Sequence, residues 1–153
     1  TRRLQKIKES KTTVDLLLPM SDIDIILKES DYISLACPLT PITKNMINKK
    51  SFKLMKNSAV FINTSRGGIV NELDLINALK KKEIQGAALD VFSSEPLDKT
   101  SELFNLENVF LSPHISGNFS RYQEIMMRQF GDMLSRFIDN KSFKNRVCKK
   151  RLY

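Results

Sequence analysis

The sequence predicts an α/β fold built on a parallel β-sheet. Short, almost continuous apolar runs recur along the 153 residues, and such runs are typical of strands that are buried on both faces. The segments between these runs carry apolar residues at helical spacing. Charged residues follow several of the runs, as they do where parallel strands end at a ligand-binding edge. We therefore expect a parallel sheet that helices cover on both faces.

Five apolar runs are predicted to form strands, at Val14–Leu18, Tyr32–Cys37, Ala59–Asn63, Gly86–Val91 and Val109–Leu111. Each run is short and bounded by polar or turn-forming residues, which favours a strand over a helix. The second run is stopped by Pro38 and by the turn around Pro41. The count predicts a sheet of five strands.

Five segments are predicted to form helices, at residues 21–30, 49–55, 72–81, 101–106 and 119–138. Ser21 or Asp22 can cap the first helix, and Asn71 can cap the third, because these side chains accept hydrogen bonds from the first turn. The third helix has apolar residues at Leu73, Ile76 and Leu79, which follow the helical period. The last helix is long and amphipathic, and we expect its apolar face to pack on a further domain or on a dimer partner.

Composition excludes several classes of protein. With 41% apolar and 27% charged residues, the chain is ordinary globular material, either one domain or a piece of a larger protein. No apolar run approaches the roughly 18 residues of a spanning helix, and no signal peptide is recognisable. Cys37 and Cys148 lack the spacing of metal ligands and are expected to be reduced thiols. We expect a cytoplasmic protein with no bound metal and no membrane partner.

The net charge of +8 is concentrated at the two ends of the chain. Residues 1–11 carry five basic side chains against one acid, and residues 141–153 carry six basic side chains and no acid. Proteins that bind nucleic acid usually spread a basic face over the fold. The pattern favours a solvated basic tail, and no nucleic-acid partner is expected.

Three residues are candidates for acid–base chemistry on an anion. The single histidine, His114, follows the last predicted strand, and an imidazole exchanges protons near neutral pH. Arg66 and Glu95 follow the third and fourth predicted strands. Because the carboxyl ends of parallel strands meet at one edge of a sheet, the three side chains are expected at that edge.

A doubly wound nucleotide-binding domain also needs a strand, a glycine-rich turn and a helix at its start. No Gly-x-Gly-x-x-Gly sequence occurs in the 153 residues, and the chain begins at Thr1 without an initiator methionine. Two interpretations follow. Either the chain is another kind of α/β domain, or its front part is absent.

Four stretches resemble the D-isomer-specific 2-hydroxyacid dehydrogenases. Asn63–Glu72, which reads N-T-S-R-G-G-I-V-N-E, resembles the arginine signature of that family. Ala88–Phe92 with the following Glu-Pro-Leu, and Ser112–Ile115, resemble two further signatures. Cys37–Thr43 resembles the stretch beside the cofactor. The similarity covers residues 12 to 140 approximately, in the order of the family.

The resemblance implies a partial doubly wound parallel sheet of the Rossmann type that lacks its first strand–glycine turn–helix unit. Residues 1–140 would be the C-terminal portion of the dinucleotide-binding domain, and residues 141–153 a basic tail. The substrate domain and the glycine-rich loop would be absent from this chain. The last nine residues resemble the closing segment of glyoxylate/hydroxypyruvate reductase-like members.

The resemblance also implies an activity, the reduction of a small 2-keto acid to a D-2-hydroxy acid with NADP or NAD, or the reverse. Arg66 would hold the substrate carboxylate, since its planar fork of donors matches a carboxylate. His114 would donate the proton to the carbonyl oxygen, and Glu95 would orient its ring and stabilise its charged form. The full-length protein would be a homodimer, and the fragment alone is expected to be inactive.

The family pattern also suggests which residues contact the cofactor. The candidates are Arg2, Arg3, Cys37, Pro38, Thr64, Ser65, Asp90, His114 and Gly117. Arginine near the adenine ribose suits a 2′-phosphate, so Arg2 or Arg3 favours NADP. An alternative function is a non-catalytic, nucleotide-sensing or corepressor-like binding module of the same family.

Overall fold

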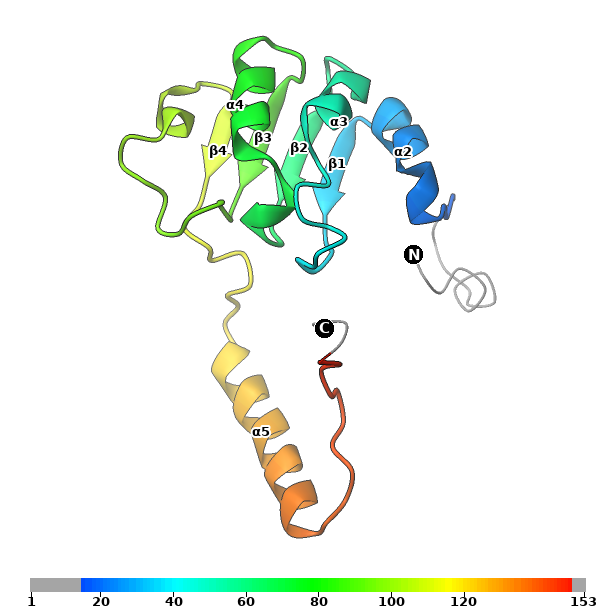
Figure 1. Ribbon diagram of the computed structural model, residues 1–153. Coiled ribbons are helices and arrows are strands. Elements are labelled where there is room, and N and C mark those ends of the chain that lie inside the picture. Colours follow the sequence, from blue (N-terminus) through cyan, green and yellow to red (C-terminus); the bar gives the residue numbers. More distant parts are fainter. Residues whose placement is uncertain (1–14, 150–153) are drawn as a thin grey trace. The chain divides into compact units, whose positions relative to one another are not determined.

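A computed structural model describes residues 15–149 of the chain. It divides into two compact units, with the boundary between Pro113 and His114. Each unit is described by itself below. The first unit contains the sheet and its helices, and the second contains one long helix and the basic segment that follows it (Figure 1).

The first unit is built on a four-stranded parallel sheet, which confirms the predicted sheet type. Its strands are β1 (Tyr32–Leu35), β2 (Val60–Asn63), β3 (Gly86–Leu89) and β4 (Val109–Leu111), in that spatial order. The prediction of a strand at Val14–Leu18 is wrong over 15–18, where the backbone forms no strand, and residue 14 lies outside the described residues. An apolar run becomes a strand only where a neighbouring strand pairs with it, and the sequence alone does not show the neighbour.

The helices of this unit include the four predicted segments and, after β2, a 3₁₀ helix that was not predicted. They are η1 (Met20–Asp22), α2 (Ile23–Glu29), α3 (Lys49–Leu54), η2 (Gly67–Ile69), α4 (Glu72–Lys80) and η3 (Glu102–Asn105). Asn71 caps α4 as predicted, because its side chain accepts a hydrogen bond from the backbone N–H of Asp74. Asp22 precedes α2, but its side chain makes no capping bond. The segment at 101–106 is a short 3₁₀ helix that Ser101 caps.

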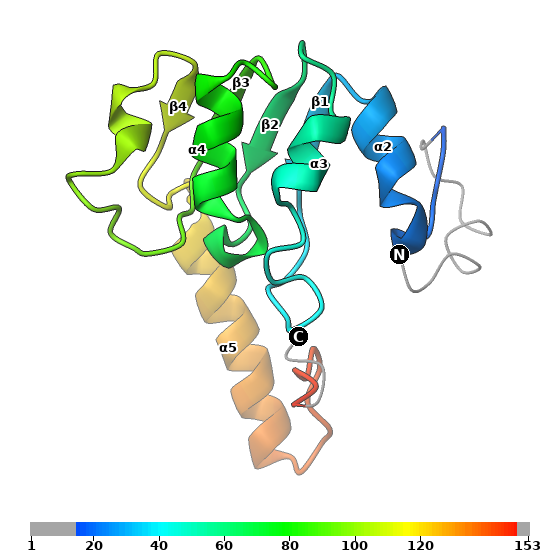
Figure 2. The ribbon, with the colours of Figure 1, turned by 45° about the horizontal axis from the view of Figure 1, so that its top comes forward.

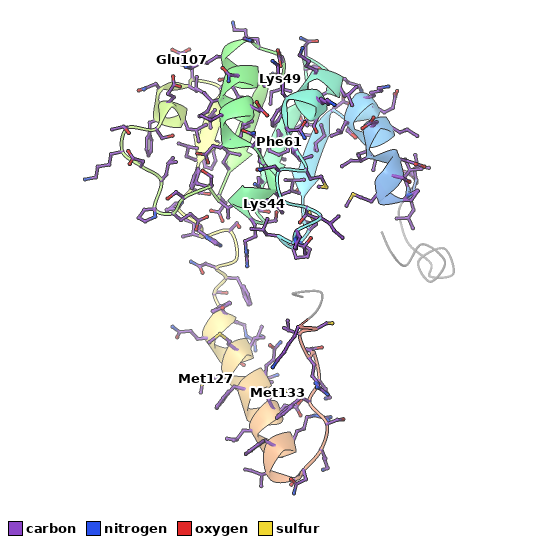
Figure 3. All side chains as sticks on the ribbon, in the orientation of Figure 1. Lys44, Lys49, Phe61, Glu107, Met127 and Met133 are labelled. Carbon is purple, nitrogen blue, oxygen red and sulfur yellow. The ribbon has the colours of Figure 1, made fainter. Side chains whose placement is uncertain are left out.

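The helices α2, α3 and α4 lie side by side along one face of the sheet, as two views show (Figures 1 and 2). The core lies between these helices and that face. Its centre is Phe61 of β2, which is fully buried and packs edge-to-face against Phe52 of α3, with ring centroids 5.6 Å apart (Figure 3).

Two rows of side chains, in register across the four strands, point into this core. One row is Ile33, Phe61, Ala87 and Val109, and the next is Leu35, Asn63, Leu89 and Leu111. Asn63 is the one polar member of these two rows, and only 1% of its surface is exposed. It is also the last residue of β2, where the sheet meets the loops.

The opposite face of the sheet is not covered by the described residues of the first unit. Tyr32 and Phe110, on the two outer strands, are 73% and 70% exposed. Ser34 is exposed as well, and Ile62 and Ala88 beside it are half-buried. Within the described part of this unit, helices cover one of the two faces. The apolar runs indicate a sheet with two apolar faces, but they do not show which segment covers each face.

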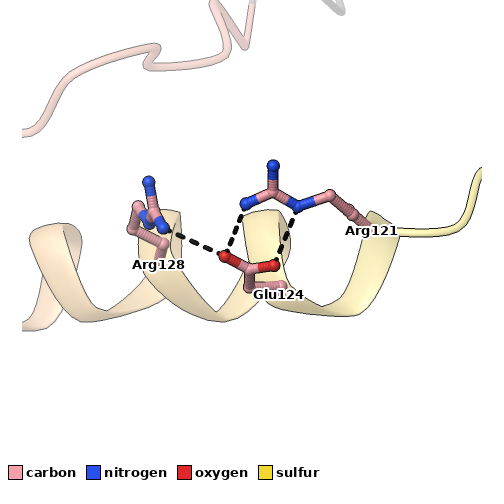
Figure 4. A network of polar contacts seen from close by, with 3 residues as sticks. All are labelled: Arg121, Glu124 and Arg128. Carbon is pink, nitrogen blue, oxygen red and sulfur yellow. Dashed lines mark hydrogen bonds and ion pairs between the residues drawn. The ribbon is translucent and has the colours of Figure 1, made fainter.

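The second unit contains α5 (Tyr122–Ile138), which begins three residues later than predicted. Its first turns carry an ion-pair network in which Glu124 accepts hydrogen bonds from Arg121 and Arg128 (Figure 4). The hydrogen bond from Arg121 lowers the pKa of Glu124. No residue of α5 is buried within the described part of the chain, and its apolar face is exposed as expected.

A basic segment follows α5, and within it Phe143 stacks on Phe137 of the helix. None of the helices in the range 15–149 combines the length and the apolar character that crossing a bilayer requires.

Candidate active site at the carboxyl ends of the strands

The carboxyl ends of all four strands face the same edge of the sheet, because the strands are parallel. The structure places the predicted residues of the first unit in the loops at this edge. Cys37 and Pro38 follow β1, the stretch Thr64–Arg66 follows β2, and Asp90 and Glu95 follow β3. Arg66 and Glu95 thus lie at the edge where the sequence predicted them, in loops that follow two neighbouring strands.

The loop that carries Arg66 is bonded to the end of its own strand. The side-chain amide of Asn63 donates to the carbonyl oxygen of Arg66 at 3.1 Å. The amide oxygen of Asn63 accepts from the backbone N–H of Ser65 at 3.1 Å and from its hydroxyl at 3.0 Å. The guanidinium of Arg66 is exposed, and one of its nitrogens donates to the carbonyl oxygen of Ser65 at 2.6 Å.

The same loop is held from one side by the segment that follows β1. The carbonyl oxygens of Gly68 and Ile69 accept hydrogen bonds from the backbone N–H groups of Asn45 and Ile47, and Ile47 in turn accepts from Asn71. These bonds form a short parallel bridge between the two loops. The backbone that follows Arg66 is therefore bonded to the loop after β1.

On the other side, the loop packs directly against the loop of Glu95. A Cβ atom at Gly67 would lie 1.8 Å from the carbonyl oxygen of Phe92, so only glycine allows this approach. The backbone N–H of Phe92 donates to Oε1 of Glu95 at 3.0 Å, and the N–H of Ser93 donates to Glu72 at 2.9 Å. Gly67 thus allows Phe92, whose N–H holds the Glu95 carboxylate, to approach the loop of Arg66.

Asp90 joins the ends of three strands. Its backbone N–H donates to the carbonyl oxygen of Asn63 at 3.0 Å, and its carboxylate accepts from the hydroxyl of Ser112, which follows β4. Asp90 is 2% exposed, so this pairing takes place in a buried setting where a polar group needs a partner. The carboxyl ends of the strands are thereby tied together below the loops.

Cys37 and Pro38 lie at the start of the loop after β1. Burial raises the pKa of the half-buried Cys37 thiol, which makes a nucleophilic role for Cys37 unfavourable. Thr43 holds this loop, because its hydroxyl donates to the carbonyl oxygen of Pro38 at 2.7 Å. In the described residues, no group of three histidine, cysteine, aspartate or glutamate side chains could hold a metal ion.

The third predicted catalytic residue, His114, is the first residue of the second unit. It is exposed, and its backbone is in the left-handed region with φ 54°. Gly117, in the same unit, has no heavy atom within 4 Å of the position a Cβ would take. Arg2 and Arg3 lie outside the described residues.

Several polar residues that bond at this edge were not among the predicted site residues. Asn63, Glu72 and Ser112 all bond to the loops that carry or adjoin the predicted residues. A usable signal was present for Asn63, because an amide that ends an apolar strand is unusual. The partner of Glu72 lies 21 residues away in sequence, and no local pattern indicates it.

Comparison with known proteins identifies the family. Residues 3–116 match the sequence profile of the D-isomer specific 2-hydroxyacid dehydrogenase, NAD binding domain. The chain belongs to this family. The match includes the loops of Arg66 and Glu95 and the stretch around His114, so it covers every predicted catalytic residue.

Curated relatives of this dehydrogenase-family chain are considerably longer than it is. It is 55% identical over 94 residues to the glyoxylate reductase of Thermococcus litoralis, covering 61% of this chain and 28% of the relative. It is 43% identical over 126 residues to glyoxylate/hydroxypyruvate reductase B of Enterobacter agglomerans, covering 82% of this chain and 39% of the relative. The chain thus spans about a third of the length of these relatives.

Solved structures of the family resemble the chain over most of its length. An NADPH-dependent glyoxylate/hydroxypyruvate reductase from Sinorhizobium meliloti, in complex with NADP and sulfate, matches 94% of this chain and 47% of its own, with a TM-score of 0.84 at 28% identity. A D-isomer specific 2-hydroxyacid dehydrogenase from Xanthobacter autotrophicus, in complex with NADPH and MES, matches 88% of this chain and 55% of its own, with a TM-score of 0.81 at 30% identity.

The residues at the sheet edge fit the nicotinamide cofactor that the family binds. Thr64 is exposed after the end of β2, and half-buried Cys37 and exposed Pro38 follow the neighbouring β1. Groups at the carboxyl ends of adjacent parallel strands are the usual contacts for such a cofactor.

Proposed function

We propose that the protein containing this chain reduces small 2-keto acids to D-2-hydroxy acids with NADPH or NADH, glyoxylate and hydroxypyruvate being the preferred candidates. The observation that supports this most is the packing of the Arg66 loop against the Glu95 loop through Gly67, in a chain of this family. In this proposal, residues 1–140 are the C-terminal portion of a dinucleotide-binding domain and 141–153 are a basic tail.

Arg66 binds the substrate carboxylate in this proposal. Its guanidinium is exposed, and within the described residues one of its nitrogens donates to a backbone oxygen, so further donors are available to a bidentate anion. A bidentate contact also fixes the orientation of the substrate, which decides the face of the keto carbon that reacts.

His114 and Glu95 carry the proton chemistry. The bound cofactor supplies the hydride for the keto carbon, and negative charge then develops on the carbonyl oxygen. The imidazolium of His114 donates a proton to that oxygen, and accepts it in the oxidation direction. The Glu95 carboxylate hydrogen-bonds the other ring nitrogen, which fixes the ring and stabilises its charged form.

Some of the proposed cofactor contacts come from this edge, and others come from the start of the chain and from the second unit. The residues that would hold it are Arg2, Arg3, Cys37, Pro38, Thr64, Ser65, Asp90, His114 and Gly117. The arginines at 2 and 3 favour NADP over NAD. We also propose a cytoplasmic homodimer, without a nucleic-acid or membrane partner.

A substrate screen of the full-length protein tests this function. Oxidation of NADPH and of NADH is measured with glyoxylate, hydroxypyruvate and larger 2-keto acids, and with a ketone that lacks the carboxylate. We expect turnover with the acids only. Arg66→Lys is expected to raise KM for the acid about tenfold or more, because an ammonium cannot form the two-pronged contact. Arg128→Lys, an exposed arginine of α5, is the matched control.

Two results would contradict the proposal. Absence of turnover with every 2-keto acid and both cofactors rules out the reductase. Binding of NADPH or NADH without turnover, measured by titration, favours the nucleotide-sensing alternative.

A further inference from the structure

Asn63 is a buried amide at the end of the central strand β2. It faces the core in a row with three leucines, and 1% of its surface is exposed. A polar side chain in such a place costs free energy unless all its groups find partners. Its amide has partners on both its nitrogen and its oxygen, and every one of them belongs to Ser65 or Arg66.

These bonds hold the chain on both sides of the Arg66 side chain. The backbone N–H of Ser65, before Arg66, donates to Asn63, and the carbonyl oxygen of Arg66 itself accepts from Asn63. The Cα atom of Arg66 lies between these two fixed points. The exposed guanidinium is held by its hydrogen bond to the carbonyl oxygen of Ser65 and not by packing, so its direction depends on this backbone.

Only asparagine supplies the required pair of groups at this length. The loop presents one backbone donor and one backbone acceptor, and a carboxamide has both an acceptor and a donor. An ionised aspartate of the same size would direct a second oxygen at the carbonyl of Arg66. Leucine or alanine would leave the N–H of Ser65 without this acceptor, and would leave the carbonyl oxygen of Arg66 with only the N–H of Ile69.

We propose that Asn63 is a positioning residue, which fixes the Ser65–Arg66 backbone so that the guanidinium is aimed at the substrate carboxylate. The inference rests on the proposed function of Arg66, and extends it to a residue inside the core. Asn63 acts through Arg66 and does not touch the substrate.

The kinetic test uses Asn63→Asp and Asn63→Ala in the full-length protein, at saturating NADPH. The matched control is Asn108→Ala, since the side chain of Asn108 also donates to two backbone carbonyls, of Leu79 and Gln85, at the opposite edge of the sheet. We expect both Asn63 variants to lower kcat/KM for the 2-keto acid about 10- to 100-fold, mostly through KM, as a misdirected binding group does. Asn108→Ala should leave kcat/KM unchanged.

A double-mutant cycle separates positioning from general support of the fold. In an Arg66→Ala background the guanidinium is absent, so Asn63→Asp should change kcat/KM by about twofold or less. If Asn63→Asp lowers kcat/KM by the same factor in both backgrounds, Asn63 does not act through Arg66 and the inference is wrong.

Hydrogen exchange tests the same inference without activity. The amide hydrogen of Ser65 should exchange at least about tenfold faster in Asn63→Ala than in the wild type, because it loses its acceptor. It should not change in Asn108→Ala. Unchanged exchange in Asn63→Ala overturns the inference even if the protein reduces 2-keto acids. A wild type without reductase activity refutes the proposed function and leaves this measurement to decide the role of Asn63.

Discussion

The backbone of His114 is left-handed, with φ 54°. Histidine, asparagine and aspartate adopt this conformation more readily than most residues. Replacing His114 by alanine should lower kcat by about two to four orders of magnitude, the contribution of a positioned acid–base group. Steady-state rates of the full-length protein measure the loss.

His114→Asn is the control, because asparagine tolerates the positive φ and cannot exchange the proton near neutral pH. It should be as inactive as alanine and should unfold at the wild-type temperature. Wild-type kcat in either variant would remove His114 from its proposed role.

Glu95→Gln removes a charge and keeps an acceptor for the N–H of Phe92. The loop is therefore expected to stay in place. Reduction needs the imidazolium form, and a neutral amide stabilises that form less than a carboxylate does. The fall in rate with rising pH should begin at lower pH in the variant. The pH profile of kcat/KM measures this shift, with Glu107→Gln as a control on the surface.

The direction in which the pH profile of kcat/KM shifts in Glu95→Gln decides whether Glu95 has the proposed role. A profile equal to that of the wild type, or one displaced to higher pH, would show that the Glu95 carboxylate does not stabilise the charged imidazole.

The rate at which the Cys37 thiol is alkylated should depend on pH, and this dependence does not involve the proposed reaction. Burial raises the pKa of its thiol, so less thiolate is present at a given pH and alkylation is slower. In a Cys148→Ser variant, Cys37 is the remaining cysteine. Its alkylation rate should still increase with pH in the range where the alkylation rate of a free cysteine has become constant. Peptide mass spectrometry gives this rate. Levelling off at or below the free-cysteine range would contradict the expected direction.

At the level of elements, the contact between the Arg66 and Glu95 loops depends on Gly67. A Cβ there would overlap the backbone of Phe92, which cannot rotate away as a side chain does. Gly67→Ala should therefore lower the free energy of unfolding by about 1–3 kcal/mol, the usual cost of overpacking. Denaturant unfolding measures it.

Gly68→Ala is the matched control for this substitution. Its added Cβ would meet only the flexible side chain of Leu39, at 3.0 Å. The loss of stability should be clearly smaller than for Gly67→Ala. Equal losses would show that the approach of Phe92 is not what requires glycine.

The sequence predicted the elements best where local chemistry determines them. Asn71 caps α4 as expected, and the four confirmed strands end within two residues of their predicted limits. The strand predicted at 14–18 failed over its described residues because pairing is not a local property. For the same reason, the apolar run of β4 does not show which segment covers Phe110, which is 70% exposed.

For the candidate site, the sequence predicted where its residues lie relative to the strands. Parallel strands place their following residues at one edge, so the positions of Arg66 and Glu95 followed from the predicted strands. The bonds of Asn63, the approach of Gly67 to Phe92 and the contact of Glu72 with Ser93 were not predicted. The last two join loops that are separated by more than 20 residues, and they become visible only once the chain is folded.

At the level of the whole molecule, apolar surface is exposed in both units. Tyr32 and Phe110 lie on the uncovered sheet face, and Met127 and Phe130 of α5 are 64% and 62% exposed. Large exposed apolar patches bind hydrophobic dyes and favour association. The isolated 153-residue chain should therefore bind such a dye, unfold over a broad range of denaturant and bind no dinucleotide with useful affinity.

Dye fluorescence, denaturant unfolding and NADPH titration of that chain provide the check. A sharp unfolding transition together with tight NADPH binding would show that the exposed surfaces do not limit its stability.

The row Leu35, Asn63, Leu89 and Leu111 has a consequence for protein engineering. A redesign guided by stability alone would replace Asn63 by leucine or valine, to complete an apolar layer. Such a variant would gain buried apolar contact and lose the group that holds the Arg66 loop. Selection for heat resistance and selection for turnover should therefore favour different residues at this one position, a trade-off that is common at functional sites.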